Sequence, residues 1–60
     1  MDFSTALRFL KEGCRIRRSD WEEGEYLFLK DSIIYLFWDD RDWIEELISK
    51  DLLATDWEVM

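Results

Sequence analysis

The stretch YLFLKDSIIYLF, residues 26–37, decides the fold. Its two halves, Tyr26–Lys30 and Ile33–Phe37, are dense in the β-branched and aromatic residues that are enriched in strands. Asp31-Ser32 between them is short enough for a tight hairpin, although it lacks the glycine that such turns favour. Both halves are apolar at nearly every position. This predicts burial on both faces of the hairpin, one against a helix and one against another subunit.

A helix is expected N-terminal to this hairpin. Ser4 can cap it, and the apolar residues Phe3, Leu7 and Leu10 follow the i, i+4, i+7 spacing of one helix face. Gly13 is placed to end the helix in the left-handed conformation that glycine adopts most easily.

A short strand and a polar turn connect this helix to the hairpin. Cys14–Arg18 is predicted to be the strand, with Cys14 and Ile16 on one face. Cys14 is expected to be a small buried apolar group. Residues 19–24 are polar except for Trp21 and are predicted to form a turn.

A second helix is expected after the hairpin. Asp39-Asp40 can cap it, and its apolar stripe is Trp43, Ile44, Leu47 and Ile48. A short helical turn at Asp51–Ala54 and a last strand at Asp56–Met60 complete the predicted order α-β-β-β-α-β. The expected fold is therefore α+β, a small antiparallel sheet with an N-terminal helix and a second helix before the last strand.

The length and composition limit the possible functions. Sixty residues allow one domain, residues 1–60, and so short a chain buries only about 60% of its unfolded surface, which favours self-association. With one cysteine and no histidine there is no internal disulfide, no ordinary zinc site and no imidazole base, so we expect no cofactor and no enzyme. The lone thiol fits a reducing compartment, which predicts a cytoplasmic protein. The longest apolar run, Ile33–Trp38, has six residues, so no membrane span is expected.

Charge is distributed unevenly along the chain. Residues 1–30 are neutral overall, and residues 31–60 hold nine acidic and two basic residues and so carry the whole net charge of −7. Within the neutral half, Arg15, Arg17 and Arg18 form a compact basic spot, either solvated strand residues or an anion site. The acidic half argues against binding of a nucleic acid polymer, which needs an extended basic surface.

Two groups of residues are candidates for function. The first could hold a nucleotide, with indoles stacking on a base, guanidinium groups binding phosphate and a carboxylate accepting from a polar edge: Arg17, Arg18, Trp21, Asp56 and Trp57. Tryptophans in so short a chain can equally be core or interface anchors.

The second group is acidic: Asp39, Asp40, Asp42, Glu45 and Glu46. It is either a solvated helix face or a mimic of a phosphate backbone that blocks a basic surface on a host protein. No glycine lies where an EF-hand loop needs one, so no metal site is predicted.

Both ends of the chain carry motifs of a known family. Asp2–Leu7, Leu10–Gly13 and Arg15–Arg18 followed by Trp21, together with Asp51–Val59 near the C-terminus, resemble the phage Thoeris anti-defence protein family, second type. The resemblance covers about half of the chain. It departs from the family pattern in having no proline before Asp51 and a shortened loop after Trp21.

The resemblance implies a non-enzymatic phage protein that acts in the host cell cytoplasm. It would sequester a cyclic ADP-ribose isomer or a cyclic dinucleotide in pockets of a homo-oligomer, a dimer or tetramer. The family's motif positions correspond to the five residues selected above, Arg17, Arg18, Trp21, Asp56 and Trp57. The alternative is an acidic protein inhibitor of a host defence protein.

Overall fold

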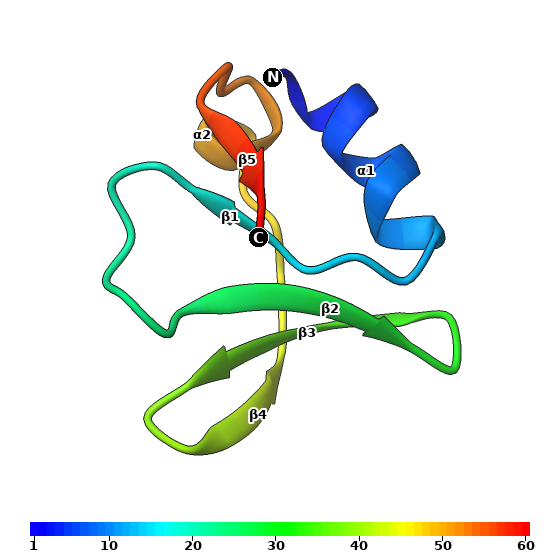
Figure 1. The fold of residues 1–60 in the computed structure, drawn as a ribbon, viewed down its shortest axis with the longest axis vertical. Coiled ribbons are helices and arrows are strands. Elements are labelled where there is room, and N and C mark those ends of the chain that lie inside the picture. The colour runs from blue at the N-terminus through cyan, green and yellow to red at the C-terminus, as the bar shows by residue number, and fades with distance from the viewer.

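A five-stranded sheet of order β4-β3-β2-β1-β5 dominates the computed structural model, which describes residues 1–60 (Figure 1). Every neighbouring pair of strands is antiparallel. The elements in chain order are α1 (Phe3–Lys11), β1 (Ile16–Arg18), β2 (Tyr26–Lys30), β3 (Ile33–Trp38), β4 (Arg41–Ile44), α2 (Ser49–Leu52) and β5 (Trp57–Val59). The predicted α+β class, with a second helix before the last strand, is confirmed. Neither α1 nor α2 has the length and hydropathy of a membrane-spanning helix.

The β2–β3 hairpin forms as predicted. Its strands pair along their full length, from Tyr26↔Phe37 to Lys30↔Ile33. The two turn residues, Asp31 and Ser32, have φ angles of 52° and 64°. Both therefore adopt the left-handed conformation that a two-residue turn between twisted strands requires, without the glycine that adopts it most easily.

The prediction of a helix with an apolar stripe from Trp43 to Ile48 is wrong. Asp39 and Asp40, with φ angles of 55° and 59°, form a second left-handed turn instead of a helix cap. This turn folds the chain back so that Trp43 pairs with Leu36 of β3, and Arg41–Ile44 becomes strand β4. The second helix is the four-residue α2, which overlaps the predicted turn at Asp51–Ala54.

The N-cap of helix α1 lies two residues before the expected one. Asp2, not Ser4, is the N-cap, and its side chain accepts a 2.9 Å hydrogen bond from the Thr5 amide. This contact lowers the pKa of Asp2. At the other end Gly13 has φ +95° directly after the C-cap Glu12, as predicted.

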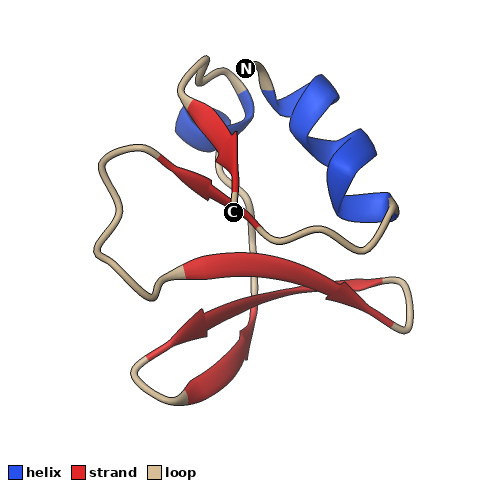
Figure 2. Cartoon of the chain, viewed as in Figure 1, coloured by secondary structure: helices blue, strands red, loops and turns tan.

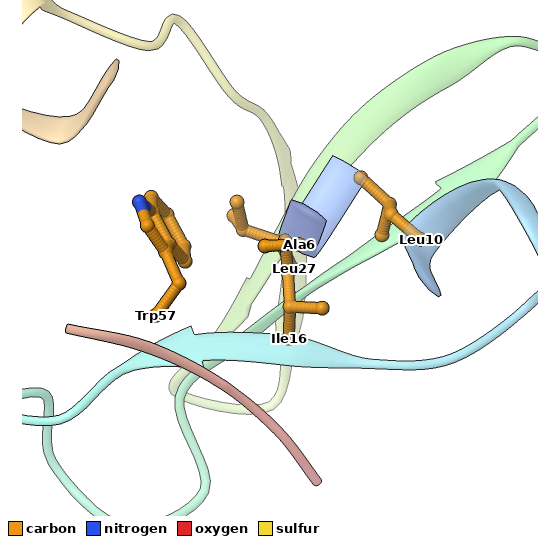
Figure 3. Packing of buried hydrophobic residues seen from close by; sticks show 5 residues of the cluster. All are labelled: Ala6, Leu10, Ile16, Leu27 and Trp57. Carbon is orange, nitrogen blue, oxygen red and sulfur yellow. The ribbon is translucent and has the colours of Figure 1, made fainter. Parts of the chain in front are cut away.

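Helix α1 lies on the side of the molecule that holds β5 and β1 (Figure 2), and the core lies between this helix and strands β1, β2 and β5. Five side chains are fully buried and come from α1, β1, β2 and β5: Ala6, Leu10, Ile16, Leu27 and Trp57 (Figure 3). Strands β3 and β4 and helix α2 contribute none. Since side chains alternate along a strand, the face of β2 opposite the buried Leu27 is not covered by α1.

Candidate functional site

Strands β1 and β5 bring the two ends of the chain together. They pair with the register Arg17↔Glu58 and Arg18↔Trp57. The backbone extends this pairing, because the Ser19 amide donates to the Asp56 carbonyl at 3.1 Å. As a result the five residues predicted from the sequence, separated by about 40 positions, lie in one cluster.

Arg18 is the centre of this cluster. Its Nε donates to Asp56 Oδ1 and its Nη1 donates to Asp51 Oδ1 at 3.0 Å. Asp56 Oδ2 also accepts from the Ser19 hydroxyl at 2.8 Å. The Arg18 side chain is only 11% exposed, so this guanidinium links β1 to α2 and to the residue before β5.

These hydrogen bonds shift the acid–base behaviour of both partners. The hydrogen bond from Arg18, followed by that from Ser19, lowers the pKa of Asp56. The same contact with Asp56 raises the pKa of Arg18. Both groups are therefore held in their charged forms.

Trp57 is a core residue. Its side chain is 1% exposed, and its Nε1 donates to the Asp51 carbonyl at 2.9 Å. The ring meets Phe3 and Trp21 edge to face, with centroid distances of 5.3 and 5.5 Å. Trp57 therefore offers no open ring face to a ligand, whereas Trp21 is half-buried at the edge of the cluster.

Arg17 fixes the loop that follows β1. Its Nη2 donates to the Trp21 carbonyl at 2.6 Å, and its Nε lies 3.4 Å from Glu58 Oε1. The side chain is 17% exposed. Arg17 thus orients the loop that carries Trp21, and both arginines of the cluster are held by acceptors within the chain.

The two hollows of the surface lie outside this cluster. One, of about 400 Å³, is lined by Gly13, Arg15, Tyr26, Phe28, Leu29, Phe37 and Asp42. The other, of about 360 Å³, is lined by Glu22, Glu23, Gly24, Phe37, Trp38, Asp39 and Asp40. None of the five predicted site residues borders either hollow. Arg15 does line the first hollow, and it belongs to the basic spot of Arg15, Arg17 and Arg18 that the sequence indicated.

The acidic residues do not form a helix face, because the segment that contains most of them is a turn and a strand. Glu45 follows β4, and burial raises its pKa. Cys14 is half-buried ahead of β1 rather than fully buried as expected. The described residues contain no cluster of acidic or cysteine side chains that could hold a metal ion.

The fold and the cluster define a small α+β domain in which charged and indole side chains join the two chain ends. The chain belongs to the Tad2-like family, described as the Thoeris anti-defense 2-like domain, whose model matches residues 1–60. This confirms the family that the terminal motifs indicated, and it supports a role in phage anti-defence. No curated protein matches the chain.

Proposed function

We propose that this phage anti-defence protein sequesters a cyclic nucleotide immune signal without altering it. The ligand would be a cyclic ADP-ribose isomer or a cyclic dinucleotide, held in pockets of a homo-oligomer. The observation that supports this is the family match over residues 1–60, together with one cluster that contains all five motif residues. The absence of histidine from the chain favours binding over acid–base catalysis.

The cluster suggests distinct roles for its members. Trp21 is half-buried and is the indole that can stack on a base. Buried Trp57 packs edge to face against it, with a distance of 5.5 Å between the ring centroids. Arg18 donates from Nε and Nη1, and Arg17 from Nε and Nη2. A guanidinium has five N–H donors, so the remaining nitrogen of each side chain is left for phosphate oxygens. Asp56 keeps Arg18 oriented and supplies an acceptor for a polar edge of the ligand.

Sequestration makes demands on concentration and affinity. Because nothing turns over, the protein must match the signal in concentration and bind it with a low Kd. A pocket closed by a second copy helps, since excluding water strengthens the contacts between arginine and phosphate.

Calorimetry with cyclic ADP-ribose isomers and cyclic dinucleotides tests the proposal. We expect one of them to bind and to be recovered chemically unchanged, as judged by mass spectrometry. Trp21→Ala should weaken binding by about tenfold or more, because base stacking is worth about 1–3 kcal/mol. Trp43→Ala, which removes an indole from the distant strand β4, is the matched control and should bind as the parent does. Absence of heat with every ligand would overturn the proposal, and altered ligand would indicate an enzyme.

A second candidate function is the blocking of a basic surface on a host defence protein. The observation that favours it is the acidic hollow, where Glu22 and Glu23 meet the Asp39-Asp40 turn. Glu22→Lys together with Glu23→Lys should then abolish anti-defence activity in infected cells, and Trp21→Ala should retain it. Nucleotide sequestration predicts the reverse pattern.

A further inference from the structure

Four aromatic rings of β2 and β3 lie on the sheet face opposite α1. Tyr26 stacks on Phe37 across the β2–β3 pair with a centroid distance of 5.1 Å. Phe28 stacks on Tyr35 in the same way at 5.4 Å. All four rings are only partly buried, and Ile44 beside them on β4 is 69% exposed. We call these four rings the open aromatic face.

A charged side chain stands at each end of one row across this face. The Arg15 guanidinium lies 4.5 Å above the ring of Tyr26, Tyr26 stacks on Phe37, and Phe37 pairs with Asp42 of β4. All four residues line the hollow of about 400 Å³. Arg15 and Asp42 are exposed, and neither is among the ion pairs of the chain. The order along the row is therefore a positive charge (Arg15), two aromatic rings (Tyr26 and Phe37) and a negative charge (Asp42).

Such a row is complementary to itself. A twofold axis through its middle, between Tyr26 and Phe37, reverses the order of the four residues. The rings of one copy then meet the rings of the other, and each positive end meets a negative end. A twofold interface needs this property, because the same patch must serve both partners.

We propose that a second copy of this chain covers the open aromatic face, with Arg15 of each copy against the partner's Asp42. The inference deepens the proposed function, which requires an oligomer, by naming the face on which two copies meet. This interface does not depend on which nucleotide is bound.

Charge and area favour a second copy over other occupants. A phosphate placed beside Arg15 would share the hollow with the carboxylate of Asp42, which repels it, whereas a second copy neutralises both charges. Interfaces of standard size bury about 800 Å² of each partner, roughly a fifth of the 4343 Å² surface of this chain. A sheet face supplies a patch of that kind, and burying its rings would compensate for a core of only five residues.

Sedimentation velocity on two charge reversals tests the interface. Arg15→Glu alone and Asp42→Arg alone should each weaken self-association by about tenfold or more, because each places two like-charged pairs in the interface. An equimolar mixture of the two single variants should associate again, since every contact in the mixed dimer then joins opposite charges. The double variant should also recover.

The mixture is the decisive measurement. A pair that acted within one chain could not be rescued by mixing, so failure of the mixture to associate would overturn the proposal. It would also be overturned if the single variants associated as the parent does, or if the parent were monomeric. Arg8→Glu on α1 and Glu46→Arg after β4 are matched controls that change charge by the same amounts on exposed residues elsewhere.

Nucleotide calorimetry separates this result from the proposed function. If the parent binds no nucleotide but the mixture associates, the interface stands and sequestration fails. If the parent binds nucleotide but charge reversal leaves association unchanged, sequestration stands and another face joins the copies. Circular dichroism of each variant should show the spectrum of the parent, because both residues are exposed and neither forms an ion pair in the chain.

Discussion

Two halves of this molecule are built on different principles. The half formed by α1, β1, α2 and β5 contains four of the five buried side chains and all three ion pairs. The β3–β4 hairpin contains no buried side chain. Its strands are held by their backbone ladder, by stacking against β2 and by a 3.3 Å bond from Trp43 Nε1 to the Trp38 carbonyl.

This difference separates the residues that form the core of one copy from those that remain at its surface. The family motifs lie in the first half, where they build the core and the charged cluster. Ile34 and Leu36 of the hairpin pack against the core, whereas Trp38, Trp43 and Ile44 are exposed. A second copy of the chain, as proposed above, would bury such exposed apolar residues. Substitutions should therefore have large effects on the stability of a single copy in the first half and small ones in the second.

The largest expected effect separates two tryptophans. Trp57→Ala leaves a cavity among the other buried residues and should cost about 3–5 kcal/mol, comparable with the whole stability of so small a domain. Trp43→Ala, at a side chain that is 47% exposed, should cost less than about 1 kcal/mol. Urea unfolding followed by circular dichroism, at concentrations below self-association, measures both. If both variants lost the same free energy of unfolding, the distinction between the two halves would be wrong.

The next effect separates two arginines. Arg18→Met leaves Asp51 and Asp56 without their shared donor and should cost about 1–2 kcal/mol, because the pair is partly shielded from water. Arg41→Met on β4 removes a charge that forms no ion pair and should change the free energy of unfolding by less than about 0.5 kcal/mol. The same urea series gives both values, and a greater loss from Arg41→Met would contradict the comparison.

A smaller effect, of opposite sign, is expected in the hairpin. Ser32→Gly should stabilise the protein by about 0.5–1 kcal/mol, since its φ of 64° is a conformation that glycine adopts without strain. Ser4→Gly within α1 should destabilise by about 0.5 kcal/mol, because glycine is a poor helix former. Thermal unfolding should shift the Tm upward for the first variant and downward for the second.

The smallest effects are on the pH dependence of stability. The pKa of Asp56 is lowered by Arg18, so its stabilisation is present above the usual value of 3.8 and is lost as the pH falls below it. The pKa of Glu45 is raised by burial, so its contribution runs the other way, and stability falls as the pH rises above 4.5 and the carboxyl ionises. Asp56→Asn should flatten the acid side of the profile, and Glu45→Gln should flatten the fall above 4.5. The Tm measured from pH 3 to pH 8 tests both slopes.

The parts of this fold that could be predicted from sequence are those fixed by local chemistry. The β2–β3 hairpin follows from its composition, and the end of α1 follows from Gly13. Strand β4 could not be found in this way. Apolar residues at 43, 44, 47 and 48 have the spacing of a helix face, but the left-handed turn at Asp39-Asp40 pairs Arg41–Ile44 with β3 instead.

The candidate site shows the same limit. Residue types and family motifs selected five positions that the β1–β5 pairing does bring together. Sequence could not tell that Trp57 is buried while Trp43 is exposed, because indoles occur in both environments. Nor could it tell that the guanidinium of Arg15, and not those of Arg17 or Arg18, faces a hollow. That outcome depends on which arginine finds a carboxylate, and Asp56 lies 38 residues from Arg18.

The pairing of β1 with β5 also determines when this domain can fold during synthesis. The interior strand β1 obtains its second neighbour only from residues 57–59, and Trp57 covers a core whose other members lie among the first 27 residues. Residues 57–59 therefore have to leave the ribosome before the core can form. Folding of the domain follows its translation instead of accompanying it. A nascent chain arrested after β4 would hold its hairpins without the indole that completes the interior, and its apolar surfaces would be open to chaperones and proteases.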